Sequence, residues 1–136
     1  MLPFESQRVL LVDDSAEFRR SLVKIFLKAG FQVRAVSDGD AALEVVRQEA
    51  YPLIVTDLKM TGKSGLDLLR EIKVHSPDSQ VIIVTAAGDV DSYHEAMQMG
   101  VSSYLYKPIK RETILEAAKH ALEKTHAPGA GQGGST

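Results

Sequence analysis

The 136-residue sequence contains no cysteine, which excludes a disulfide framework, a thiolate zinc site and a cysteine nucleophile. It also lacks any apolar run near the roughly 18 residues that a transmembrane helix needs, and residues 1–5 do not resemble a signal peptide. Its 16 Lys and Arg residues are balanced by 18 Asp and Glu, so the net charge of −2 gives no basic field for nucleic acid or membranes. These absences predict a cytoplasmic protein that contacts neither membranes nor nucleic acid directly.

What the sequence does contain is the composition of a single globular domain, with 44% hydrophobic and 25% charged residues. Two short runs, 9–12 and 81–84, are apolar throughout, which is typical of strands buried on both faces of a parallel sheet. The run 31–36 alternates between apolar and polar residues and suits a strand nearer the edge. The predicted strands are Val9–Val12, Phe31–Val36, Leu53–Val55, Val81–Val84 and Ser103–Tyr106.

Amphipathic helical patterns follow each predicted strand. Gly30 is expected to end the first helix, and Ser37-Asp38 to cap the second. Strict alternation of strand and helix predicts an α/β fold, a (βα)5 doubly wound, five-stranded parallel sheet with helices on both faces. The apolar stripes are Phe18-Leu22-Ile25-Ala29, Ala42-Leu43-Val46, Leu66-Leu69-Ile72, Val90-Tyr93-Met97 and Ile114-Leu115-Ala118-Leu122.

The pattern divides the chain into three parts. Residues 1–7 are predicted to be an N-terminal arm, residues 8–124 the domain, and residues 125–136 a flexible Gly-rich tail or linker. The strand–helix units therefore leave no room for a second domain in this sequence.

Polar residues stand at the ends of four of the predicted strands. Asp13 and Asp14 follow the first strand, Asp57 the third, Thr85 the fourth and Lys107 the fifth. In open parallel sheets, functional sites form beyond the carboxyl ends of the strands. We therefore expect these five side chains at one edge of the sheet.

Three carboxylates at one edge repel one another, by about 1 kcal/mol for a pair 4 Å apart in water and about 4 kcal/mol at an effective dielectric constant of 20. A cation is needed to neutralise them, and oxygen ligands without histidine or cysteine favour a hard ion, Mg²⁺. Lys107 adds a fixed positive charge and Thr85 a hydroxyl donor. Together these groups offer the nucleophile, the charge neutralisation and the orientation that phosphoryl transfer requires.

The same residues resemble the motifs of one known family, the receiver domains of two-component response regulators, over residues 8–124. The resemblance implies a flavodoxin-like receiver fold and a role in phosphorelay signal transduction in bacteria. Each motif lies at the expected strand end. The motifs are Val12-Asp13-Asp14-Ser15, Asp57-Leu58-Lys59-Met60-Thr61-Gly62 followed by Ser64-Gly65, Val84-Thr85-Ala86, and Tyr104-Leu105-Tyr106-Lys107-Pro108.

The resemblance implies a role for each site residue. Asp57 is expected to accept a phosphoryl group from a sensor histidine kinase or a phosphotransfer protein. Mg²⁺ is expected to bind Asp13, Asp14, Asp57 and the backbone carbonyl of Lys59. Lys107 is expected to pair with Asp57 before transfer and with the phosphoryl oxygens afterwards. The domain is expected to support only its own phosphorylation and dephosphorylation, and not to be an enzyme acting on other substrates.

A conformational switch is also implied by the resemblance. Thr85 is expected to move toward the phosphoryl oxygens and Tyr104 to turn inward, and the bond from Lys107 to Pro108 is expected to be cis. These movements change the surface formed by the fourth helix, the fifth strand and the fifth helix. An output domain or a partner protein is expected to bind there, with a weak phosphorylation-dependent dimer as a further expectation.

Three places depart from the family pattern. Ile109 replaces a phenylalanine that is frequent after the Lys-Pro pair. Thr61 stands where proline is usual and lacks proline's fixed φ, which predicts a looser loop. Ser102-Ser103 stands where one large DNA-binding subfamily carries an acidic pair that it uses in its dimer, so we do not expect that dimer in this chain.

Three other functions compete with this interpretation. A haloacid-dehalogenase-like phosphatase needs a second aspartate two residues after its nucleophile, but Asp13 is followed directly by Asp14 and Ser15. A flavodoxin-like cofactor binder needs a phosphate loop where these two aspartates would repel phosphate. A pseudo-receiver that acts only as an interaction module predicts the loss of a site residue, and none is missing from the sequence.

Overall fold

The computed structural model describes residue 2 and residues 4–126. The elements in this part of the chain are β1 Arg8–Val12, α1 Ala16–Lys28, β2 Gln32–Val36, α2 Gly39–Gln48, β3 Leu53–Thr56, α3 Gly65–His75, β4 Gln80–Thr85, α4 Val90–Gln98, β5 Ser103–Tyr106 and α5 Arg111–His126. All these strands are parallel and form one sheet in the order β2-β1-β3-β4-β5. The predicted α/β fold is therefore confirmed, and β2 lies at an edge as its alternating pattern indicated.

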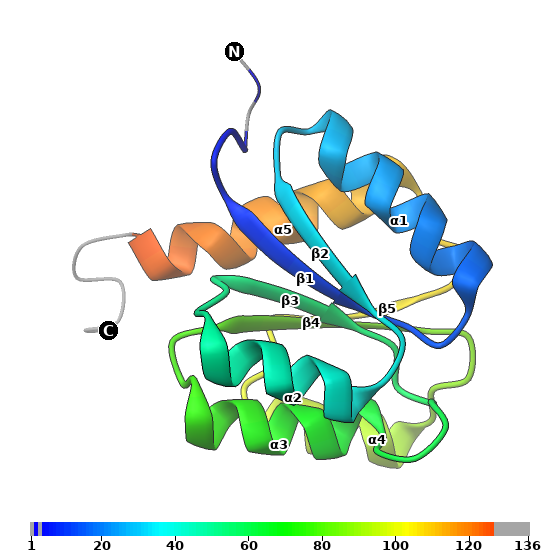
Figure 1. The fold of residues 1–136 in the computed structure, drawn as a ribbon. Helices are drawn as coiled ribbons and strands as arrows, with labels where there is room; N and C mark the ends of the chain where they lie inside the picture. Colours follow the sequence, from blue (N-terminus) through cyan, green and yellow to red (C-terminus); the bar gives the residue numbers. More distant parts are fainter. Residues whose placement is uncertain (1, 3, 127–136) are drawn as a thin grey trace.

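The sheet separates two hydrophobic cores. Figure 1 shows α1 and α5 on one face, and α2, α3 and α4 on the other. Successive strand residues point to opposite faces, so Leu11 packs with Phe26 of α1, whereas Leu10 packs with Leu69 of α3. Because both faces are covered, the central strands have no solvated side, which is why their sequences are continuously apolar.

Local signals in the sequence set the helix ends. The Asp38 carboxylate accepts a hydrogen bond from the Ala41 N–H at 2.8 Å and caps α2, as predicted. Gly30 follows α1 with a φ of 105°, a left-handed conformation that side chains disfavour. The hydroxyl of Ser15 caps α1 by accepting from the Phe18 N–H. These ends direct each helix back across the sheet.

The predicted helix α4 is present, but its apolar stripe does not face the core. Val90, Tyr93 and Met97 face solvent, with Val90 71% exposed, and Ala96 is the buried residue of this helix. When a short helix has large apolar residues on one face and a small residue on another, the spacing of its residues does not show which face packs against the sheet. The exposed stripe therefore belongs to the molecular surface and not to the core.

The ends of the chain differ from simple tails. Phe4 in the N-terminal arm is buried, and its ring stacks on Phe31 with centroids 4.7 Å apart. Helix α5 continues to His126, two residues past the predicted limit of the domain, and residues 127–136 of the predicted tail lie outside the described residues. Within the described part of the chain, the helices are too short or too polar to cross a bilayer.

Candidate functional site

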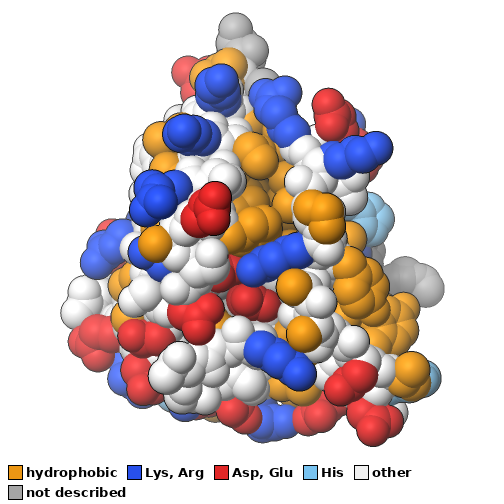
Figure 2. All heavy atoms as spheres, turned by 90° about the vertical axis from the view of Figure 1, so that its right-hand side faces the viewer, with side chains coloured by type: hydrophobic (Ala, Val, Ile, Leu, Met, Phe, Trp, Pro, Cys, Tyr) orange, Lys and Arg blue, Asp and Glu red, His pale blue; other side chains and the backbone are white. Residues whose placement is uncertain are grey.

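The candidate site lies at the carboxyl ends of the strands. Val12 pairs with Thr56 in register, so the residues that follow them, Asp13 and Asp57, leave the sheet side by side. The Asp57 N–H donates to the Val12 carbonyl at 3.0 Å and extends this pairing by one residue. Figure 2 looks onto this edge, where acidic side chains gather near the centre beside a basic one.

Three carboxylates form the centre of the site. Asp13, Asp14 and Asp57 each offer one oxygen, and these oxygens lie within 4.8 Å of one another. Asp13 and Asp57 are buried, whereas Asp14 is exposed. The sequence-based expectation that the acidic residues meet at one edge is met by all three.

Lys107 reaches into the cluster from the end of β5. Its Nζ lies 3.0 Å from Asp13 Oδ2 and 3.2 Å from Asp57 Oδ2, and its peptide bond to Pro108 is cis. The ammonium group also lies 4.1 Å from the ring centroid of Phe18 on α1. Sequence reasoning did not assign the contact with Asp13 or the role of Phe18, because Phe18 fitted the apolar stripe of its helix.

Burial raises the pKa of Asp13 above its usual value. The Ser15 N–H, which donates to Asp13 Oδ1 at 2.8 Å, and the Lys107 ammonium group oppose this shift, while the charge of Asp57 adds to it. The ionised cluster is therefore held at a cost in free energy, and a cation beside it lowers that cost.

Thr85 is the last residue of β4, and Tyr104 lies in the neighbouring strand β5. Thr85 is fully buried, and its hydroxyl oxygen accepts from the Ala87 N–H at 3.2 Å, which leaves its own O–H free to donate elsewhere. Tyr104 is in the inward position, 8% exposed, with its hydroxyl 2.8 Å from Ser92 Oγ on α4. No sequence signal pointed to this Ser92 contact, since Ser92 also completes a capping box with Asp89.

The loop between β3 and α3 closes the site on one side. Lys59 lies two residues after Asp57 with its side chain exposed. Gly65, the first residue of α3, packs so closely on this loop that a Cβ there would lie 2.9 Å from Leu58 Cα and overlap the Asp57 carbonyl oxygen. Glycine is therefore required to bring α3 against the backbone of Asp57.

The donor set suits a hard divalent cation. The cluster consists of three carboxylates, and carboxylate oxygens are ligands that Mg²⁺ prefers. The residues present therefore fit the ion that the sequence predicts.

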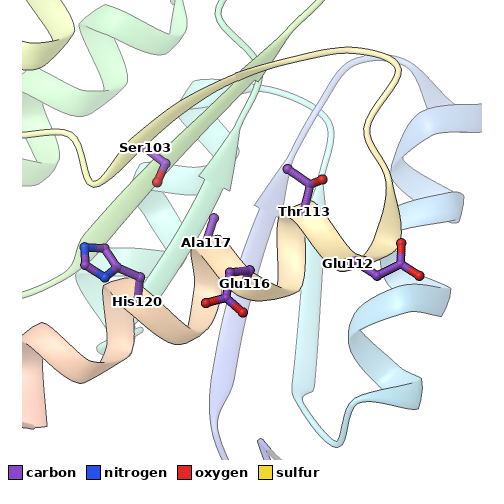
Figure 3. Close-up of a pocket in the computed structure, with 6 residues that line it drawn as sticks. All are labelled: Ser103, Glu112, Thr113, Glu116, Ala117 and His120. Atoms are coloured by element: carbon purple, nitrogen blue, oxygen red, sulfur yellow. The ribbon is translucent and has the colours of Figure 1, made fainter.

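A separate hollow lies on the surface along β5 and α5 (Figure 3). Figure 3 shows Glu112, Glu116 and His120 on α5 and Ser103 on β5, which all line this hollow. The hollow contains none of the three aspartates, so it is a different surface from the acidic site.

Comparison with known proteins shows which family the chain resembles. Residues 9–119 match the family model of the response regulator receiver domain. The chain is 39% identical over 116 residues to response regulator protein FleR of Pseudomonas aeruginosa, covering 85% of this chain and 24% of that protein. It is 32% identical to sporulation initiation phosphotransferase F of Bacillus subtilis, covering 86% of this chain and 94% of that protein.

Solved structures agree with the sequence comparison. A response regulator receiver domain protein from Clostridium thermocellum superposes with a TM-score of 0.82 at 30% identity, covering 87% of this chain and 95% of that one. A CheY-like receiver domain protein from Methanospirillum hungatei, at 24% identity, shares the fold with a TM-score of 0.88 over 92% of this chain and 100% of that one. The chain therefore belongs to the response regulator receiver domain family and is a signalling module of two-component systems.

Proposed function

We propose that this receiver, acting in the cytoplasm, accepts a phosphoryl group on Asp57 from a sensor histidine kinase or a phosphotransfer protein, in a reaction that depends on Mg²⁺. The observation that carries the proposal is the position of Asp57, buried at the carboxyl end of a central strand, where the Lys107 ammonium group bridges it to Asp13. A nucleophilic carboxylate, a fixed cation and a metal-binding pair of carboxylates meet at this point.

The two carboxylate oxygens of Asp57 accept hydrogen bonds from different donors. Oδ1 accepts from the Leu58 N–H at 2.6 Å, and Oδ2 accepts from Lys107 at 3.2 Å. In the transfer, an Asp57 oxygen forms a bond to phosphorus as the phosphorus–nitrogen bond of the donor histidine breaks, and solvent supplies the proton that leaves with the imidazole. Lys107 then pairs with the phosphoryl oxygens, and the free O–H of Thr85 donates to them.

Asp13, Asp14, Asp57 and the backbone carbonyl of Lys59 are the groups that we propose hold Mg²⁺. When bound, the ion supplies charge neutralisation for the phosphoryl oxygens. Around it, the Ser15 N–H fixes the orientation of Asp13, and Lys107 keeps the two buried carboxylates together.

Tyr104 contacts aromatic side chains on the surface formed by α4 and β5. Its ring lies 5.3 Å from that of Tyr93 on α4 and 5.6 Å from that of Tyr106, and both neighbours are exposed. We propose that phosphorylation favours this inward arrangement by drawing Thr85 toward the phosphoryl group. The switch is then a shift in the population of two arrangements, driven by contacts that only the phosphorylated form makes.

The output surface that we propose is the α4–β5–α5 face. It combines the exposed apolar side chains of Val90, Tyr93, Met97 and Tyr106 with the acidic hollow of Figure 3. Such a surface suits a partner protein or an attached output domain and not nucleic acid. This chain spans about a quarter of the transcriptional regulatory proteins DctD and ZraR that it resembles, so control through further domains is part of the proposal.

Incubation with a small phosphoramidate or acyl-phosphate donor is expected to add one phosphoryl group, because Asp57 is the buried nucleophile beside Lys107. Intact mass measurement should show this gain in the wild type only when Mg²⁺ is present. Asp57→Asn is expected to abolish the gain, whereas Asp78→Asn, an exposed aspartate before β4, should leave it unchanged. A wild type that binds Mg²⁺ yet gains no mass from several donors would identify a pseudo-receiver.

Phosphorylation is also expected to change the amide NMR shifts of the α4–β5–α5 face, because Tyr104 contacts side chains from both α4 and β5. A stable phosphoryl mimic on Asp57 should shift the amides of Ser92, Tyr93 and Tyr106 more than those of α2. Clear shifts at Leu58 with unchanged shifts on this face would show that the mimic binds at Asp57 without changing the face. That result would reject the proposed switch.

A further inference from the structure

The loop after Asp57 touches the acidic cluster through one backbone group. The Thr61 N–H donates to Asp14 Oδ2 at 3.2 Å, across 47 positions of sequence. Among the residues that the structure describes, this is the sole hydrogen bond that the Asp14 carboxylate accepts, and it forms no ion pair there. Proline has no N–H, so the residue usual at this position in the family cannot make the contact.

The three carboxylates differ in how firmly they are held. Asp13 accepts from the Ser15 N–H and Lys107, and Asp57 accepts from the Leu58 N–H and Lys107. Asp14 is exposed and has the Thr61 N–H alone. Without that bond its side chain is free to rotate away from the other two.

We propose that the Thr61 amide is a positioning group that holds Asp14 in the cluster before Mg²⁺ binds. The inference rests on the proposed function, in which Asp14 is a ligand of the ion. A carboxylate has about four lone-pair sites, so an amide on Oδ2 leaves acceptor capacity for a cation. Fixing the side chain in advance removes part of the entropy cost of binding and so raises affinity.

The contact also joins the ion site to the loop between β3 and α3. Gly62, which follows Thr61, has a φ of 80°, and a Cβ added there would meet nothing within 4 Å, so the left-handed backbone of Gly62 shapes the turn at this point of the loop. Because coupling is reciprocal, a loop that holds Asp14 favours Mg²⁺ binding, and bound Mg²⁺ favours the ordered conformation of the loop.

The test compares two variants that differ in the donor at position 61. Thr61→Ala keeps the N–H and should bind Mg²⁺ as the wild type does, whereas Thr61→Pro is expected to bind about three- to tenfold more weakly, which is the net contribution of one typical hydrogen bond. Mg²⁺ titrations followed at the Ser15 and Leu58 amides measure this, with thermal melting as a check that both variants fold. Equal affinities for the two variants would overturn the inference.

A second measurement needs no metal. The Thr61 amide proton is expected to exchange several-fold faster in Asp14→Ala than in the wild type, since the acceptor is gone. Equal exchange rates would show that the bond does not form and would overturn the inference. A wild type that binds no Mg²⁺ contradicts the proposed function instead, and the exchange experiment still decides whether Thr61 holds Asp14.

Discussion

Lys107→Met is expected to lower the free energy of unfolding at pH 7 by about 3 kcal/mol, the lower part of the range for breaking a buried ion pair. Methionine keeps most of the stem that packs near Phe18, so the change removes the charge more than the contact area. Asp13 and Asp57 then face each other without the ammonium group that lies between them. Chemical denaturation of both proteins at one ionic strength measures the difference.

The loss of stability in Lys107→Met should depend on pH, and the direction of this dependence follows from the pKa of Asp13. The pKa of Asp13 is already raised by burial, and removing Lys107 deletes two of the effects that oppose this rise. A carboxyl group whose pKa is higher in the folded than in the unfolded state favours folding below the unfolded value and loses this contribution as pH rises through the folded value. The gap between wild type and variant should therefore narrow as the pH is lowered from 7 toward and through the raised pKa of Asp13.

Asp13→Asn provides the matched control for Lys107→Met. Added to the lysine variant, it removes one of the two unpaired charges but keeps an oxygen that can accept from the Ser15 N–H. Stability at pH 7 should recover by more than half of the loss. A loss that neither pH nor Asp13→Asn changes would mean that Lys107 acts through packing and not through charge.

Gly65→Ala is expected to cost about 3 kcal/mol of stability and to impair phosphorylation, although alanine is the better helix former by about 1 kcal/mol. The new Cβ would lie 2.9 Å from Leu58 Cα and overlap the Asp57 carbonyl oxygen. These neighbours are backbone atoms, so α3 or the segment that carries Asp57 must move. Denaturation midpoints and the yield of phosphorylated protein measure the two effects.

Gly62→Ala is the control for Gly65→Ala, because it introduces backbone strain without a steric overlap. Gly62 has a φ of 80°, but a Cβ added there would meet nothing within 4 Å, so alanine costs only the left-handed conformation, about 1 kcal/mol. Equal losses for the two variants would contradict the close approach of α3 to Asp57.

The arrangement of strands and acidic residues was accessible from the sequence because it depends on order along the chain. Parallel strands end at one edge, so Asp13, Asp57 and Lys107 all stand at that edge, and the first two follow neighbouring strands. The orientation of α4 was not accessible. Its apolar stripe has helical spacing, but spacing alone does not say that Ala96 faces the sheet and Tyr93 faces solvent.

Contacts that depend on rotamers or on the backbone were also beyond sequence reasoning. Phe18 fits a core stripe, and nothing in its spacing indicates that its ring faces the Lys107 ammonium group. The Thr61 N–H is common to every residue except proline, so its bond to Asp14 carries no residue-type signal beyond the absence of proline. Phe4 lies in a segment too short to show a period, yet it packs on Phe31.

The chain order of the strands also bears on how the domain assembles. The carboxylates arrive with β1 and β3, whereas Lys107 arrives with β5, which is synthesised after both. Until β5 docks, the acidic edge is uncompensated, and mutual repulsion opposes compaction there. Docking of β5 is thus the step that brings the compensating positive charge of Lys107 to this edge.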